Sequence, residues 1–191
     1  MSVSVLLRRA RFSRGGAWAV GLALLPLLAL CALWVSGFHI NMTASLPYGL
    51  YREVDVPVQR GVLVLACLPQ GPHAELARQR HYLSPGHCPA RLAPLIKPVV
   101  AVAGDQVVFA DAAVEVNGVA LTNSAALPRD PSGHPMPRPQ PRQQRLADGQ
   151  LLLVSSYNPG SFDGRYFGVL DADAVHAVVE PVLTWHRRGM R

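Results

Sequence analysis

One long segment without charge sets the first limit on how this chain can fold. Residues 17–38, AWAVGLALLPLLALCALWVSGF, hold 22 residues and no charged side chain. At about 1.5 Å of helical rise per residue, such a segment covers the roughly 30 Å hydrocarbon core of a bilayer. Pro26 is compatible with this assignment, because membrane helices tolerate helix-breaking residues. The segment therefore predicts one transmembrane helix at 17–38.

The residues before this segment predict its orientation. Residues 1–16 carry four arginines and no acidic residue. The positive-inside rule keeps such a basic segment in the cytoplasm and places residues 39–191 across the membrane. A cleaved signal peptide is the alternative, although 22 apolar residues are long for one. The 153 residues from 39 to 191 are enough to form one domain with a core of its own.

The distribution of charge indicates contact with lipid rather than with nucleic acid. The net charge is +6, but four arginines precede the apolar segment and three lie within the last five residues. Between these ends, 11 basic residues face 12 acidic ones. A nearly neutral body with basic ends fits an anionic bilayer better than a phosphate-binding surface. No basic stretch is interleaved with aromatic residues, as single-strand binding requires.

Two cysteines lie in the part predicted to be exported, where disulfides persist. A bridge between Cys67 and Cys88 would close a loop of about 22 residues and contribute about 3 kcal/mol in the chain-entropy model. Two free thiols are one alternative. A zinc site with His73, His81 or His87 is the other, but the spacing matches no regular zinc pattern. We therefore expect a disulfide and no metal ion.

The remaining pattern is mostly that of β-strands. Residues 49–54 and 61–68 are rich in valine, leucine and tyrosine, which favours strands. Residues 72–83, with Pro72 near the start, predict a short helix. Residues 95–122 form the clearest β region, and their Asn117-Gly118 pair is a strong hairpin signal.

Prolines modify this pattern in two places. Pro98 lacks a ladder donor, so we expect it at the start of a strand or along a sheet edge. Residues 128–145 hold six prolines and predict a solvated, mobile loop. Strands are expected again at 149–156 and, as one or two strands, at 174–185. The predicted fold class is mostly β.

A serine and a lysine are the candidate catalytic residues. Ser45 follows the apolar segment in NMTASLPYGLYR, and Lys97 is the only lysine beside 17 arginines. A serine nucleophile needs a base, and no histidine here lies in a recognisable triad motif. Burial lowers the pKa of a lysine towards the range of a general base, which an arginine cannot reach. Lys97 is the only charge in APLIKPVVAVAG. One alternative is that Lys97 only extends its amine to solvent from a strand edge. The other is that codon usage favours arginine and leaves a single lysine by chance.

Four motifs in order resemble those of the serine–lysine signal peptidases. They are NMTASLPYGLY, IKPVVAVAGDQV, VEVNG and SFDGRYFG, and a GHCP stretch precedes the lysine segment. The chain is most similar to the shorter, TraF-type branch that processes pilin subunits in conjugative transfer. The resemblance extends from about residue 17 to residue 185. It implies a signal-peptidase-like antiparallel β-sheet catalytic domain behind one N-terminal transmembrane helix.

The resemblance also implies catalytic roles. Ser45 would be the nucleophile and Lys97 its general base. The backbone N–H of Ser45 would hold the oxyanion with help from the Thr43 hydroxyl. Without the resemblance, Thr43 is equally read as an ordinary turn residue.

Three further residues gain expected roles in the same way. Ser161 would hydrogen-bond Lys97 and orient it, unless it is only a turn serine. Asp163 and Arg165 would form an ion pair that holds their loop, most simply as a structural element. The family usually has Asp-Ser-Arg here, whereas this chain has glycine at position 164. This departure removes any hydrogen bond from a serine hydroxyl at that position.

The expected function follows from these roles. The chain would be a single-pass protein of a bacterial inner membrane with a periplasmic catalytic domain. It would remove leader peptides from membrane-inserted precursors, such as a pilin-like subunit of a conjugative or type IV secretion system, without a cofactor. The alternatives are a catalytically silent, anchored assembly component of that apparatus and a general-purpose signal peptidase.

Overall fold

The computed structural model describes residues 24–26 and 36–186, and the contacts divide the chain into two units, Met1–Phe38 and His39–Arg191. The predicted basic segment 1–16 lies outside the described residues, as does most of the predicted transmembrane helix. Within the described part, no helix is long and apolar enough to cross a membrane.

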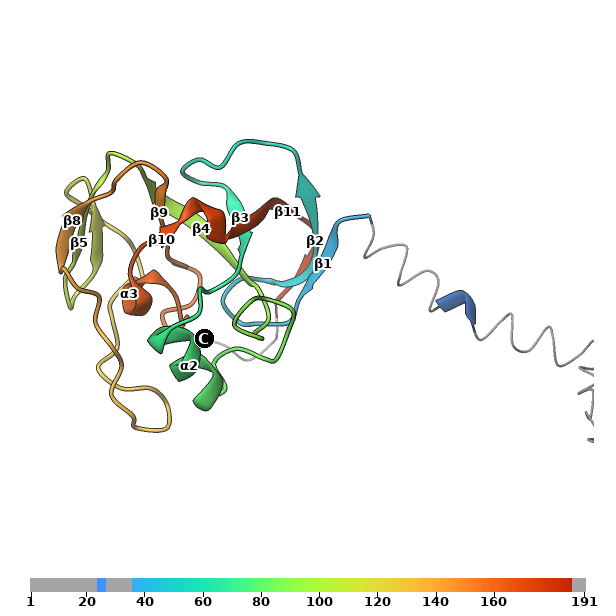
Figure 1. The fold of residues 1–191 in the computed structure, drawn as a ribbon, viewed down its shortest axis with the longest axis horizontal. Helices are drawn as coiled ribbons and strands as arrows, with labels where there is room; N and C mark the ends of the chain where they lie inside the picture. Colours follow the sequence, from blue (N-terminus) through green and yellow to red (C-terminus); the bar gives the residue numbers. More distant parts are fainter. Residues whose placement is uncertain (1–23, 27–35, 187–191) are drawn as a thin grey trace, which may run out of the picture. The chain divides into compact units, whose positions relative to one another are not determined.

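The second unit is built on a seven-stranded sheet (Figure 1). Every strand pair with a described register in this sheet is antiparallel. In spatial order the strands are β1 (Phe38–Asn41), β2 (Tyr48–Val54), β11 (Val175–Trp185), β3 (Leu63–Ala66), β4 (Leu95–Val102), β9 (Gln150–Leu153) and β10 (Leu170–Asp171).

The described residues of this unit also form a smaller four-stranded sheet and three short helical segments. In spatial order the strands are β7 (Val119–Ala120), β6 (Val114–Val116), β5 (Gln106–Phe109) and β8 (Gln143–Arg145). The helices are α2 (Pro72–Gln79) and α3 (Gly164–Phe167), with the 3-10 turn η1 (Ala172–Ala174). The prediction of a mostly β domain with antiparallel strands is confirmed.

The strands β4 and β9 contribute side chains to both of the two larger hydrophobic cores. The larger core packs α2 and α3 against β3, β4 and β9 (Figure 1). The smaller core lies between β5 and β6 on one side and Ala101 of β4 with Leu152 of β9 on the other. Val99 belongs to the larger core and Ala101 to the smaller one, although residues two apart on a regular strand share a face. The pairing of β4 with β9 shifts register between these two residues, which lets the strand change faces there. β4 thus contributes buried side chains to both cores.

The predicted hairpin at Asn117 and Gly118 is confirmed. Both residues have positive φ, 52° and 78°, between the paired strands β6 and β7. Two residues with positive φ are what a type I′ turn requires, and asparagine followed by glycine supplies them with little strain.

The expectation for Pro98 is wrong. Pro98 lies in the middle of β4, which is an interior strand between β3 and β9. β4 pairs with β3 as far as Pro98, opposite Leu63, and with β9 only from Val99 onward. Pro98 can therefore be accommodated, because it stands where one ladder ends and the other begins.

The proline-rich segment 128–145 is mostly irregular, but its last three residues form β8. Several side chains hold the segment to the domain. The Tyr82 hydroxyl donates to Asp130 at 2.5 Å, and Met136 packs against the larger core. Whether the segment moves stays a prediction.

A disulfide joins Cys67, just after β3, to Cys88, in the loop before β4. Both residues are buried, and their Cα atoms are 5.5 Å apart. Among the described histidines, only His176 brings a ring nitrogen within 4.8 Å of both sulfurs. The sulfurs that would ligate a metal are thus bonded to each other.

Reduction of this disulfide should lower the stability of the domain. We expect the Cys67→Ser, Cys88→Ser double variant to lose about 3 kcal/mol of unfolding free energy. Without the bridge, the unfolded chain regains the conformational entropy that the closed loop had removed. Chemical denaturation of both proteins, with and without a dithiol reductant, measures the loss. A wild-type protein that is equally stable with and without the reductant would contradict a structural role for the bridge.

Candidate active site

Ser45 lies in the turn between β1 and β2, and Asn41 fixes the shape of that turn. The Asn41 side chain is buried at the end of β1. Its Nδ2 donates to the carbonyl oxygens of Thr43, Leu46 and Pro47 at 3.2, 3.3 and 3.0 Å. Its Oδ1 accepts the backbone N–H of Thr43 at 3.1 Å. One amide therefore organises most of the turn, a role that the sequence analysis did not assign.

Thr43 is exposed, and its hydroxyl already has an acceptor. Thr43 Oγ1 donates to Asn41 Oδ1 at 2.8 Å. A hydroxyl has only one hydrogen to donate. To stabilise an oxyanion, the Thr43 hydroxyl would first have to leave Asn41, so its expected catalytic role stays a prediction.

Lys97 lies in the middle of β4 with 1% of its surface exposed. The alternative that it snorkels to solvent is therefore wrong. Burial lowers the pKa of Lys97 from its usual 10.5 to about 8, against the opposing influence of the Asp163 carboxylate. The amine loses its hydration in this setting, which disfavours its charged form.

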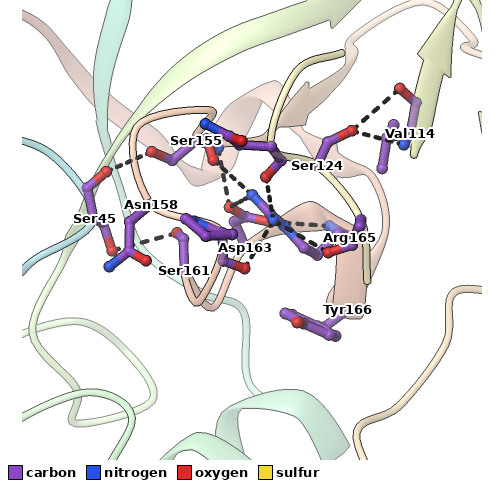
Figure 2. A network of polar contacts seen from close by, with 12 residues as sticks. Ser45, Val114, Ser124, Ser155, Asn158, Ser161, Asp163, Arg165 and Tyr166 are labelled. Carbon is purple, nitrogen blue, oxygen red and sulfur yellow. Dashed lines mark hydrogen bonds and ion pairs between the residues drawn. The ribbon is translucent and has the colours of Figure 1, made fainter. Parts of the chain in front are cut away.

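Ser161 lies between this amine and the Ser45 hydroxyl. Lys97 Nζ donates to Ser161 Oγ at 2.7 Å. Ser161 Oγ donates in turn to Ser45 Oγ at 3.3 Å (Figure 2). Ser161 is itself buried, whereas Ser45 is half-buried. The structure thus joins the predicted base and nucleophile through the residue expected to orient the base.

Asp163 and Arg165 form an ion pair whose side chains are fully buried. Arg165 Nε donates to Asp163 Oδ1 at 2.8 Å and Nη2 to Oδ2 at 3.1 Å. The guanidinium also donates to the carbonyl oxygens of Asn123, Ser155 and Pro159 at 2.8, 2.6 and 3.0 Å. These contacts leave few donors unpaired and so offset part of the cost of burying the pair. It ties the Ser161 loop to two other segments.

Two residues that the sequence analysis missed contact the backbone around Ser45. The Ser155 hydroxyl donates to the carbonyl oxygen of Ser45 (Figure 2). Asn158 Nδ2 donates to the carbonyl oxygen of Ala44 at 3.2 Å. No motif marks these residues, because their acceptors are main-chain atoms more than 100 positions away along the chain.

Gly164 begins α3 where the chain departs from the usual Asp-Ser-Arg pattern. A Cβ atom at this position would lie 2.6 Å from Leu152 Cδ1 and 2.7 Å from the Leu153 carbonyl oxygen. Both distances are shorter than real contacts allow. Glycine here therefore permits the first turn of α3 to approach β9 closely.

Known proteins match this chain over most of its length. The family described as signal peptidase, peptidase S26, matches residues 14–185. The chain belongs to this signal peptidase family. The plasmid transfer protein TraF of Escherichia coli is 41% identical over 159 residues, which cover 83% of this chain and 90% of that protein. The probable conjugal transfer protein TraF of Sinorhizobium fredii is 36% identical over 190 residues, 97% of this chain and 99% of that protein.

These relatives confirm the predicted membership of the TraF branch. A solved signal peptidase I from Enterococcus faecalis is a more distant match, with 17% identity and a TM-score of 0.37 over 64% of this chain and 97% of that one.

Substitution of Gly164 should destabilise the domain. We expect Gly164→Ala to cost about 1–3 kcal/mol of unfolding free energy, because the added methyl group must displace α3 from β9. Gly160→Ala is the matched control, since its Cβ would meet only the Asn158 side chain, at 3.3 Å. Thermal and denaturant unfolding of the three proteins measures the difference. Equal losses in both variants would mean that the close approach at Gly164 is not the cause.

Proposed function

We propose that this protein is a membrane-anchored serine endopeptidase in which Ser45 and Lys97 cleave leader peptides from exported precursors. The observation that carries the proposal is the buried Lys97 amine, with a pKa lowered to about 8, linked through Ser161 to the Ser45 hydroxyl. An amine of this kind can accept a proton near neutral pH, as a general base must. Membership of the signal peptidase family supports the same chemistry.

Lys97 would act in its neutral form. With a pKa of about 8, about a tenth of the amines are neutral at pH 7. The neutral nitrogen has a lone pair, so Ser161 can donate to it while accepting a hydrogen bond from Ser45. This reverses the hydrogen-bond direction of the charged state. Ser161 thereby orients the base and can pass the proton of Ser45 to it.

The reaction would proceed through an acyl-enzyme. As Ser45 Oγ attacks the scissile carbonyl carbon, its proton moves to Lys97, and the backbone N–H of Ser45 holds the oxyanion. The protonated Lys97 then donates to the leaving amine as the peptide bond breaks. Lys97 next removes a proton from water, which attacks the ester, and then returns that proton to Ser45 Oγ as the acyl group leaves. The scheme requires no metal ion or organic cofactor.

The relatives support a precursor used in conjugation. Proteins named plasmid or conjugal transfer protein TraF match this chain over 80% or more of its length. We therefore take a pilin-like subunit of a conjugative or type IV secretion system as the substrate, at the periplasmic face of the inner membrane. Ser45 is seven residues beyond Phe38, a reach of about 25 Å for an extended chain. A nucleophile so close to the apolar segment suits precursors that are cut beside the bilayer.

Substitution of either dyad residue should abolish processing. In Ser45→Ala the nucleophile is absent, and in Lys97→Arg the base cannot lose its proton. Each variant should reduce cleavage of a co-expressed pilin-like precursor by at least about 1,000-fold, within the range seen when such groups are removed. The size of the precursor, followed by mass spectrometry, gives the result.

Ser132→Ala, at an exposed position of the proline-rich segment, is the matched control and should cleave normally. Near-normal cleavage by either dyad variant would refute the dyad. If Ser45→Ala also supported normal conjugation, a catalytically silent assembly role would replace the proposed one.

The activity should rise with pH through the lowered pKa of Lys97. Below that pKa the amine is charged and inactive, so kcat/KM should fall about tenfold per pH unit and level off above about pH 8. Initial rates from pH 5 to 10, with circular dichroism to show that the fold is retained, measure the profile. A flat profile, or a rate that still rises about tenfold per pH unit up to pH 10, would exclude the buried Lys97 as the base.

A further inference from the structure

Two side chains hold the peptide groups on either side of the nucleophile. We infer that Ser155 and Asn158 are positioning residues that clamp the two peptide groups flanking Ser45. Ser155 holds the carbonyl oxygen of Ser45, and Asn158 holds that of Ala44. The inference rests on the proposed function of Ser45 as nucleophile. We call this pair the Ser155–Asn158 clamp.

The Asn158 contact aims the N–H that would bind the oxyanion. The carbonyl of Ala44 and the N–H of Ser45 belong to the same peptide group. In a planar trans peptide, these two groups point in opposite directions. By fixing the Ala44 oxygen, Asn158 Nδ2 therefore fixes the direction in which the Ser45 N–H points. A donor that is aimed before the reaction needs no reorganisation when the charge develops.

The Ser155 contact fixes the peptide group that carries the Ser45 carbonyl, and the backbone of Ser155 is itself held in place. Ser155 is fully buried directly after Val154, which follows β9. Its N–H donates to Asp163 Oδ2 at 3.0 Å, and its carbonyl oxygen accepts from Arg165 Nη2 at 2.6 Å. The buried ion pair thus holds both backbone polar groups of Ser155, so the hydroxyl projects towards Ser45 from a fixed position (Figure 2).

Asn158 is fixed by the loop that carries Ser161. Its Oδ1 accepts the N–H of Gly160 at 2.8 Å, and its carbonyl oxygen accepts the N–H of Ser161 at 3.0 Å. The residue that aims the Ser45 peptide therefore also positions the hydroxyl that bridges to Lys97. The clamp thereby fixes the position of Ser45 relative to Lys97, although Ser45 itself lies in a turn rather than a strand.

The test separates positioning from folding by two variants. Ser155→Ala removes the hydroxyl, while Asn158→Asp keeps the acceptor for Gly160 but loses the donor to Ala44. The substrate is a fluorogenic peptide with small residues before its scissile bond. Rates are compared on the high-pH plateau of each variant's own profile, where Lys97 is neutral, so that a pKa raised by the new carboxylate does not lower the compared kcat. We expect kcat to fall about 10- to 100-fold in each variant with KM nearly unchanged, since the clamp acts on the reacting geometry.

A melting temperature close to that of the wild type and a retained rise of activity with pH would accompany this loss. Ser156→Ala, the neighbouring serine, is the matched control and should keep the wild-type kcat. If Ser45→Ala is inactive while both clamp variants keep full kcat, the clamp is overturned and the dyad stands. If Ser45→Ala is as active as the wild type, the proposed function itself fails. A loss of kcat that only follows a loss of folded protein would also overturn the clamp.

Discussion

A lysine amine held out of water is the interaction on which the site depends. A pKa lowered from 10.5 to about 8 corresponds to about 3 kcal/mol that the fold must supply to keep Lys97 buried at neutral pH. Because the folded state binds the proton less tightly than the unfolded state, this cost is complete below pH 8. It disappears as the pH rises to 10.5. The site is therefore destabilising under the conditions in which it would work.

The architecture explains how that cost is met. Lys97 lies on β4, an interior strand on which Leu95 and Val99, two positions to either side, are buried in the larger core. The Asp163 carboxylate favours the charged amine, whereas Arg165 opposes it. Since the two form an ion pair, much of the influence of Asp163 is cancelled. Desolvation thus remains the largest cause of the pKa shift, which keeps the amine available as a base.

Sequence reasoning reached the residues whose chemistry is unusual in the chain, but not those that work through the main chain. Lys97 is conspicuous as the single lysine in an uncharged stretch, and Ser45 by its place after the apolar segment. Ser155 and Asn158 are ordinary polar residues whose partners are carbonyl groups far away in the sequence. Such contacts arise only once long-range strand pairing has brought the segments together.

The same limit accounts for the errors in the predicted fold. Pro98 was expected at a sheet edge, because the sequence shows that proline lacks a backbone donor. The sequence does not show that β4 pairs with β3 as far as Pro98 and with β9 only from Val99 onward. Asn41 begins the NMTASLPYGLY motif, but no role was assigned to it, because its importance lies in three carbonyl groups that converge on one amide. Local signals such as Asn117 and Gly118 succeeded because two adjacent residues determine the turn.

The tight contact of α3 with β9 also links two positions in evolution. A chain with serine in place of Gly164 must move the start of α3 away from the Leu153 carbonyl oxygen, and a shorter side chain at position 152 would make room for that movement. In homologous sequences, positions 152 and 164 should therefore vary together. A bulky side chain at 152 should accompany glycine at 164, and a small side chain at 152 should accompany serine.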